Sequence, residues 1–195
     1  MRERAIPLVS LKKFVEGDAA QRAEFVKALG KAFHETGFVG VVDHGIPKSL
    51  IDDFYTAAKR FFALPESVKR QYEVAGLAGQ RGYTSFGKEH AKQSKVADLK
   101  EFYQIGQFVD ENDALRAEYP DNVSVNEVPE FLELGERLYK SFEKAGSHLL
   151  RAIAIHLNLP EDYFDKNIHK GNSILRAIHY PPITQEPASA IRADQ

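Results

Sequence analysis

Few side chains in this chain could bind a metal ion or take part in a reaction. The seven histidines are the first candidates. None is followed two positions later by Asp or Glu, and no H-E-x-x-H motif occurs. His148 and His156 share one predicted helix, but the helical rise separates them by about 12 Å, too far to share a metal ion. With no cysteine present, thiolate sites are excluded as well. The sequence therefore predicts no metal site within these residues.

Nucleophiles and phosphate-binding loops are equally poorly represented. There is no G-x-S-x-G motif, so Ser85 and Ser173 lack the setting of a serine nucleophile. Neither a Walker A motif nor a dinucleotide fingerprint occurs, and the glycines within residues 76–87 do not lead into a predicted helix. His44 opens a tight turn, and we expect its ring to bond nearby backbone rather than a ligand.

Size and composition are those of an ordinary globular protein. The chain has 195 residues, of which 43% are hydrophobic and 28% are charged. Its 26 basic and 28 acidic residues give a formal net charge of −2, which predicts neither a nucleic-acid partner nor a membrane partner. No signal-peptide-like stretch and no apolar run of about 20 residues is present. Together with the absence of cysteine, this predicts a cytoplasmic protein.

The elements that must position any site follow from hydrophobic periodicity. Asp18 as N-cap and Gly37 as terminator predict a helix over residues 19–35. The apolar run at residues 38–42 predicts a strand buried on both faces. An apolar stripe that includes Phe142 and His156 predicts the longest helix, over residues 129–157. The other predicted elements are an edge strand at residues 6–9, a helix at 47–62, a short helical turn at 66–72, and strands at 99–105 and 173–180.

Residues 75–94 form an irregular, glycine-containing segment between two predicted elements. Long irregular segments inside compact domains are often functional. The predicted strands are too few to form a large sheet on their own. The fold is therefore either mostly helical, or its main sheet lies beyond the end of this chain.

Several short segments follow one another in a recognisable order. They are residues 6–11 (IPLVSL), 37–47 (GFVGVVDHGIP), 60–69 (RFFALPESVK), 82–83 (GY), 98–101 (DLKE) and 175–182 (LRAIHYPP). Together they resemble the isopenicillin N synthase-like family of iron(II)- and 2-oxoglutarate-dependent oxygenases. The chain departs from the family pattern at Ser10, Asp43 and Leu99, where Asp, Asn and Trp are usual.

The resemblance implies an α+β fold in which an N-terminal helical region carries the first strands of a double-stranded β-helix (jelly-roll), its core incomplete in this chain. It implies three parts: an N-terminal domain at residues 1–125, a long supporting helix with a short helical turn at 126–172, and the start of the jelly-roll at 173–195. Family members bind Fe(II) through a His-x-Asp pair and a later histidine, and hold 2-oxoglutarate with an Arg-x-Ser pair. The chain ends close to where His-x-Asp would begin. Fe(II) and 2-oxoglutarate are thus expected for the complete enzyme, with no iron ligand in this chain.

The resemblance also implies roles for individual residues. Tyr180 aligns with a tyrosine that contacts the 2-oxoglutarate carboxylate in many relatives. Arg176 lies on the same strand face by alternation and is expected to line the same cofactor pocket. Arg81, Tyr83 and Phe102 lie in segments that shape substrate pockets in relatives. The alternatives are packing at the strand end for Tyr180, a salt bridge for Arg176, and ordinary loop ordering and packing for the other three.

The implied function is oxidation of a small organic substrate with O₂, by an enzyme of which this chain is the N-terminal portion. Two alternatives remain open. The first is that the chain is a non-catalytic binding or interaction module that keeps the family scaffold. The second is that it is an enzyme with an unrecognised histidine–carboxylate site. The fold does not choose the substrate, and the sequence does not specify the oligomeric state.

Overall fold

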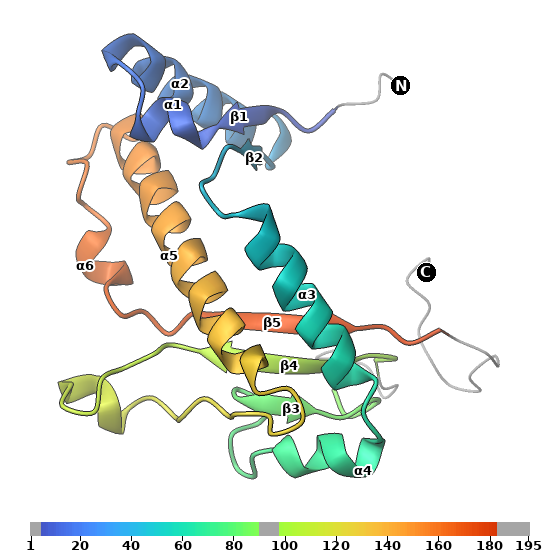
Figure 1. The fold of residues 1–195 in the computed structure, drawn as a ribbon. Coiled ribbons are helices and arrows are strands. Elements are labelled where there is room, and N and C mark those ends of the chain that lie inside the picture. The colour runs from blue at the N-terminus through green and yellow to red at the C-terminus, as the bar shows by residue number, and fades with distance from the viewer. Residues whose placement is uncertain (1–4, 90–97, 183–195) are drawn as a thin grey trace. The chain divides into compact units, whose positions relative to one another are not determined.

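The computed structural model describes residues 5–89 and 98–182, which form helices and short strands (Figure 1). They belong to two compact units. The first comprises Met1–Ile51 and Leu138–Gly171, and the second comprises Asp52–Arg137 and Asn172–Gln195. Within the described ranges, no helix combines the length and the apolar character that crossing a membrane requires.

The first unit is built around a short parallel strand pair and the helices that follow it. Its elements are β1 (Leu8–Ser10), α1 (Leu11–Val15), α2 (Ala19–Thr36), β2 (Gly40–Val42), the C-terminal part of α5 (Glu130–His156) and α6 (Asp165–Ile168). In the strand pair, Val9 lies opposite Val41. The buried core of this unit consists of Val9, Leu11, Phe14, Phe25, Val26, Leu29, Ala145 and Ala152.

Helix α2 confirms the helix predicted over residues 19–35, and its ends show why it forms. The Asp18 carboxylate accepts a hydrogen bond from the Gln21 N–H at 2.8 Å, and the Gln21 side chain accepts one from the Asp18 N–H at 3.1 Å. This reciprocal capping box satisfies two of the free N–H groups at the helix start. Gly37 ends the helix with a φ of 73°, a left-handed conformation that costs glycine little.

Removing the N-cap should cost measurable stability. We expect Asp18→Ala to lower the free energy of unfolding by about 1 kcal/mol, because the Gln21 N–H loses its acceptor. Urea unfolding followed by circular dichroism measures this loss. Asp18→Ser keeps an acceptor and should retain most of the stability. Equal losses in both variants would show that the cap is not the cause.

The strand predicted at residues 38–42 is shorter and more exposed than expected. It begins at Gly40, while Phe38 precedes it with 67% of its surface exposed, and Val42 is also exposed. Among the described residues, β2 pairs with β1 alone. The prediction of a strand buried on both faces is therefore wrong, because an apolar run does not reveal how many neighbours the strand has.

Helix α5 confirms the long helix predicted over residues 129–157. Within the predicted stripe Phe131 is fully buried, whereas Phe142 is 50% exposed, so the stripe is not covered along its whole length. The His156 ring packs against Gly30 of α2, where an added Cβ would lie 2.1 Å from the ring. This close approach explains the glycine inside α2 and gives His156 a packing role.

The second unit is a three-stranded antiparallel sheet with helical segments around it. Its elements are α3 (Lys48–Phe62, from Asp52 onward), α4 (Glu66–Lys69), a 3₁₀ turn (Arg70–Tyr72), β3 (Gly82–Thr84), β4 (Glu101–Gly106), a second 3₁₀ turn (Ala114–Ala117), the start of α5, and β5 (Ile174–His179). The strand order is β3-β4-β5, with Tyr83 opposite Tyr103 and Tyr103 opposite Ala177. The strands predicted at 99–105 and 173–180 are thus confirmed. Strand β3 lies inside the segment predicted to be irregular, of which residues 90–94 fall outside the described residues.

An aromatic cluster fills the core of this unit, with Phe61 of α3 at its centre. The Phe61 side chain is fully buried. Its ring centroid lies 5.0 to 6.1 Å from five other rings, those of Phe62, Tyr72, Tyr83, Tyr103 and Phe131. The edge-on and stacked arrangements are those that aromatic quadrupoles favour. The cluster fixes the sheet face that carries Tyr83 and Tyr103.

Candidate functional site

The β3–β4–β5 sheet presents two chemically different faces, because successive side chains in a strand point to opposite sides. In the register, Phe102 pairs with Ile178 and Gln104 pairs with Arg176, which places these four side chains on one face. We call it the arginine face. The neighbouring pairs, such as Glu101 with His179, lie on the opposite face, which the aromatic cluster covers.

Arg176 is held in place on the arginine face by three neighbours. Its Nε donates to Gln104 Oε1 at 3.0 Å, and its guanidinium carbon lies 4.3 Å above the centroid of the Phe102 ring. Its Nη1 is 3.5 Å from a carboxylate oxygen of Glu89. Gln104 is fixed in turn by a hydrogen bond from its amide to the Gly79 carbonyl. A guanidinium fixed at Nε keeps a defined orientation for its outer N–H groups.

Tyr180 follows β5 directly, and 66% of its surface is exposed. The alternating exposure along β5, with Arg176 and Ile178 exposed and Ala177 and His179 less so, continues to Tyr180. The predicted alternation of Arg176 and Tyr180 on one face thus agrees with the burial pattern. Their assignment to a 2-oxoglutarate pocket stays a prediction.

The opposite face carries a buried ionic cluster around Glu101. Its Oε2 accepts from the Lys69 ammonium at 2.6 Å and from the Tyr83 hydroxyl, and its Oε1 lies 2.8 Å from His179 Nδ1. Glu101 is 4% exposed and Lys69 is 8% exposed. The His179 ring also stacks on Phe62, with a centroid distance of 5.1 Å. A single carboxylate therefore ties α4, β3, β4 and β5 together.

The contacts of this cluster shift two pKa values in opposite directions. Burial alone would raise the pKa of the Glu101 carboxyl, but the hydrogen bonds from Lys69, Tyr83 and His179 together outweigh burial, and the net pKa is lowered. For Tyr83, burial first and then the bond to Glu101 raise the pKa of the phenol. Both shifts favour an ionised Glu101 beside a neutral Tyr83 at neutral pH.

Acid should destabilise the chain through Glu101. Because its pKa is lower in the folded state than the ordinary value of 4.5, its contribution is complete above pH 4.5 and is lost as the pH falls through the folded value. Urea midpoints measured from neutral pH down to about pH 3 should decline in this window. In Glu101→Gln the decline should be shallower, and an identical decline would contradict the assignment to Glu101.

The three residues predicted to contact substrate are all buried. The Arg81 side chain is fully buried, donates to the Gln80 carbonyl at 2.8 Å and packs its guanidinium against Gly106. Tyr83 points into the Glu101 cluster, and Phe102 lies beneath Arg176. Phe102 thus contacts a predicted cofactor residue. A direct substrate contact for the three residues stays a prediction.

The structure gives contacts at this sheet to three residues for which no role was predicted from the sequence: Lys69, Glu101 and Gln104. Lys69 is the last residue of the RFFALPESVK segment, and Glu101 is the last residue of DLKE. Their places in two family-like motifs could have singled them out. Gln104 belongs to no quoted motif, and only the register of β4 with β5 reveals it. His44 behaves as predicted, because its Nδ1 accepts a hydrogen bond from the Ile46 N–H at 3.1 Å.

Metal binding has no support from the part of the chain that the structure describes. No group of three or more His, Cys, Asp or Glu side chains lies there in an arrangement suited to a metal ion. The described residues therefore do not fit an iron site. The arginine face offers instead a fixed cation, Arg176, with the exposed Tyr180 phenol four residues further along the chain, and both groups suit an organic anion.

The chain matches a known family over most of its length. The family model described as "non-haem dioxygenase in morphine synthesis N-terminal" matches residues 6–130. Among curated relatives, the 2-oxoglutarate-dependent dioxygenase htyE of Aspergillus rugulosus is 29% identical, over 97% of this chain and 59% of that protein. The chain thus spans about six tenths of this relative's length.

Solved structures share the same fold. A 2OG-Fe(II) oxygenase family protein from Caulobacter crescentus is 37% identical with a TM-score of 0.82, over 95% of this chain and 59% of that one. A full-length Neurospora crassa protein, solved in complex with alpha-KG, is 27% identical with a TM-score of 0.74, over 90% of this chain and 54% of that one. These matches confirm the predicted mixed fold of helices and partial sheets. Given the family-model match and these relatives, the chain belongs to the isopenicillin N synthase-like family of iron(II)- and 2-oxoglutarate-dependent dioxygenases.

Proposed function

We propose that this chain is the N-terminal portion of a cytoplasmic dioxygenase that uses Fe(II) and 2-oxoglutarate to hydroxylate or otherwise oxidise a small organic substrate with O₂. The single observation that carries the proposal is Arg176, which Gln104 and Phe102 hold on an exposed sheet face. Family membership supports the reaction class. The three-part division at residues 125 and 172 belongs to the same proposal.

The arginine face would contribute recognition of the cofactor's carboxylate. The outer N–H groups of Arg176 donate to an anion, and the Tyr180 hydroxyl adds a further donor from the strand end. Bonds of this kind to a charged group contribute about 1.5–3 kcal/mol each. The side chains of Arg81, Tyr83 and Phe102 would shape the substrate side of the pocket. Arg81 and Tyr83 would do so through their packing. Iron supplies the activation of O₂ when bound, and its ligands are proposed to lie outside the described residues.

The proposal is tested by turnover in the full-length protein that contains this chain. With Fe(II) and a panel of small substrates, the protein should convert 2-oxoglutarate to succinate and consume O₂. Consumption of neither reagent, with 2-oxoglutarate or another small molecule still bound, would favour a non-catalytic binding module instead.

Arg176 and Tyr180 should affect the use of 2-oxoglutarate specifically. We expect Arg176→Met and Tyr180→Phe each to raise the KM for 2-oxoglutarate about tenfold, because each loses a bond to a carboxylate. Arg176→Lys keeps the charge but not the fork of donors and should fall between Arg176→Met and the unaltered protein. Tyr163→Phe, at an exposed position of the first unit, is the matched control. An unchanged KM for 2-oxoglutarate in both Arg176→Met and Tyr180→Phe would show that the arginine face is not part of the cofactor site.

A further inference from the structure

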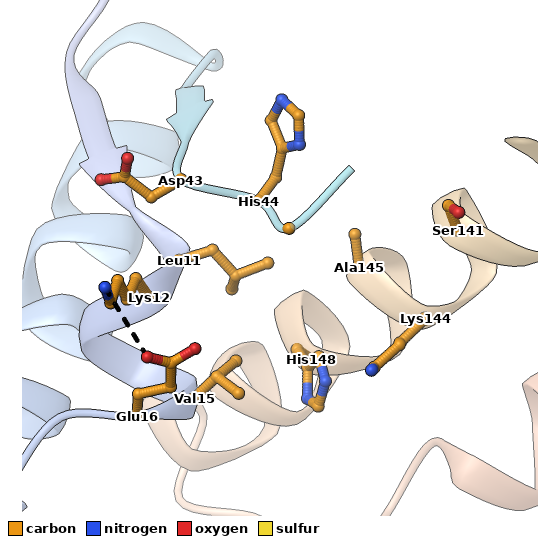
Figure 2. A pocket seen from close by; sticks show the side chains of 11 residues that line it. Leu11, Lys12, Val15, Glu16, Asp43, His44, Ser141, Lys144, Ala145 and His148 are labelled. Carbon is orange, nitrogen blue, oxygen red and sulfur yellow. Dashed lines mark ion pairs between the residues drawn. The ribbon is translucent and has the colours of Figure 1, made fainter. Parts of the chain in front are cut away.

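A pocket in the first unit takes no part in the function proposed above. Its cavity volume is about 480 Å³, within the range of roughly 300–1,000 Å³ common for small-molecule sites. The pocket lies among α1, the turn at residues 43–45 and the middle of α5 (Figure 2). All of its lining residues belong to the first unit, whereas Arg176 and Tyr180 belong to the second.

Part of the pocket wall is apolar. Leu11 and Ala145 are buried core residues whose side chains reach the pocket, and Val15 adds an exposed aliphatic group from the next turn of α1. Figure 2 shows these three side chains between the two helices. Such a wall favours the apolar body of a ligand, because contact with it removes hydrocarbon surface from water.

The charged groups around the pocket differ in the partners that they have. Glu16 pairs with Lys12 at 3.8 Å, and Asp43 accepts a hydrogen bond from the Ser10 hydroxyl at 2.6 Å. Within the described ranges, the Lys144 ammonium has no ion-pair partner. The lining thus carries two ammonium groups and two carboxylates, and on its α5 side the charged group is the Lys144 ammonium.

His148 lies one helical turn after Lys144, and Figure 2 shows the two side chains next to each other on α5. Burial first, and then the positive charges of Arg151, Lys144 and Arg22, lower the pKa of the His148 imidazole, with Glu161 opposing them. The ring is therefore neutral at pH 7 and still carries one N–H donor. A negative ligand at the Lys144 ammonium would therefore lie beside a neutral ring that can donate to it.

We propose that this pocket binds a small organic carboxylate, with its anionic group at Lys144 and His148 and its apolar body against Leu11, Val15 and Ala145. A carboxylate matches the unpaired ammonium and the neighbouring imidazole donor, and the apolar wall selects against small inorganic anions. The site lies outside the arginine face, so its occupancy does not depend on the proposed reaction.

The test uses the 195-residue chain and benzoate as the probe, with benzyl alcohol and benzylamine as the neutral and cationic analogues. Titration followed by NMR should give saturable shifts for the methyl groups of Leu11, Val15 and Ala145 and for the His148 ring. Benzoate should bind at least about tenfold more tightly than either analogue, because it alone pairs with the ammonium. Equal or tighter binding of benzylamine would overturn the proposal, as would shifts that do not saturate.

Two variants at one position separate the charge from the fold. Lys144→Met keeps the apolar stem and Lys144→Gln keeps a weak donor; each should weaken benzoate binding about tenfold or more while circular dichroism stays unchanged. The matched control, Lys27→Met on the exposed face of α2, should bind benzoate as the unaltered chain does. Unchanged affinity in the folded Lys144 variants would overturn the assignment.

The His148 ring supplies a readout that a purely structural role of Lys144 would not produce. Saturating benzoate should raise the pKa of His148, because the bound negative charge offsets Lys144 and Arg151. The shift is measured from the ring proton signals across pH in the presence and absence of benzoate. A pKa that stays the same, or falls further, at saturation would place the carboxylate elsewhere and overturn the proposal.

Discussion

Replacing Glu101 with glutamine is expected to lower the free energy of unfolding by about 3–5 kcal/mol, because it leaves the Lys69 ammonium buried without its counter-charge. Both side chains are at least 90% buried, so water cannot replace the lost partner. The Tyr83 hydroxyl also loses a charged acceptor. Urea unfolding, followed by tyrosine fluorescence in this tryptophan-free chain, measures the loss.

Two controls distinguish a buried charge from a general effect of removing an ion pair. Glu24→Gln breaks a surface pair with Lys13, whose side chains are 65% and 45% exposed, and should cost about 0–1 kcal/mol. The double variant Lys69→Met/Glu101→Gln should be more stable than Glu101→Gln alone, since it buries no unpaired charge. If Glu101→Gln proved no more harmful than Glu24→Gln, the cluster would not be the stabilising feature proposed here.

Truncating Phe61 to alanine should destabilise the chain by a similar amount, about 3–5 kcal/mol, but for a different reason. The ring is fully buried and contacts five other aromatic rings, so its removal leaves a cavity and breaks several favourable ring contacts. Urea unfolding gives the free energy, and the near-ultraviolet circular dichroism of Tyr83 and Tyr103 should weaken at the same time.

Phe61→Leu tests whether the cavity is the cause, because leucine fills much of the space and should recover a large part of the lost stability. Phe38→Ala, at a side chain that is 67% exposed, should change stability by no more than about 0.5 kcal/mol. Comparable losses for Phe61→Ala and Phe38→Ala would contradict the picture of a packed aromatic cluster.

The sequence predicted the long elements better than the short ones. Helices α2 and α5 have many turns, so their periodicity and end signals accumulate, and both lie close to the predicted bounds. Helix α1 has five residues and the 3₁₀ turn at Ala114–Ala117 has four, too few for a periodic signal, and neither was predicted. Local pattern also does not reveal that Phe142 of the predicted stripe is half exposed, because exposure depends on what packs beside the helix.

The candidate site was predictable in its motifs but not in its contacts. Arg176 and Tyr180 were singled out from the LRAIHYPP segment, and the structure shows how Arg176 is held. Its partner Gln104 lies 72 positions earlier in the chain, and no local pattern links the two. The Glu101 cluster shows the same limit, because its members come from motifs that the sequence presents separately. Only the strand register brings such residues together.

The separation between Glu101 and His179 has a consequence for synthesis on the ribosome. His179 is translated 78 residues after Glu101, which takes roughly 4–16 s at typical translation rates. During that interval one edge of β4 has no strand beside it, and unpaired strand edges are templates for association with other chains. Newly made chains thus pass through a stage in which this edge of β4 is open, and the edge closes when β5 emerges. Slower translation of residues 107–173 would lengthen that stage and should lower the yield of folded protein.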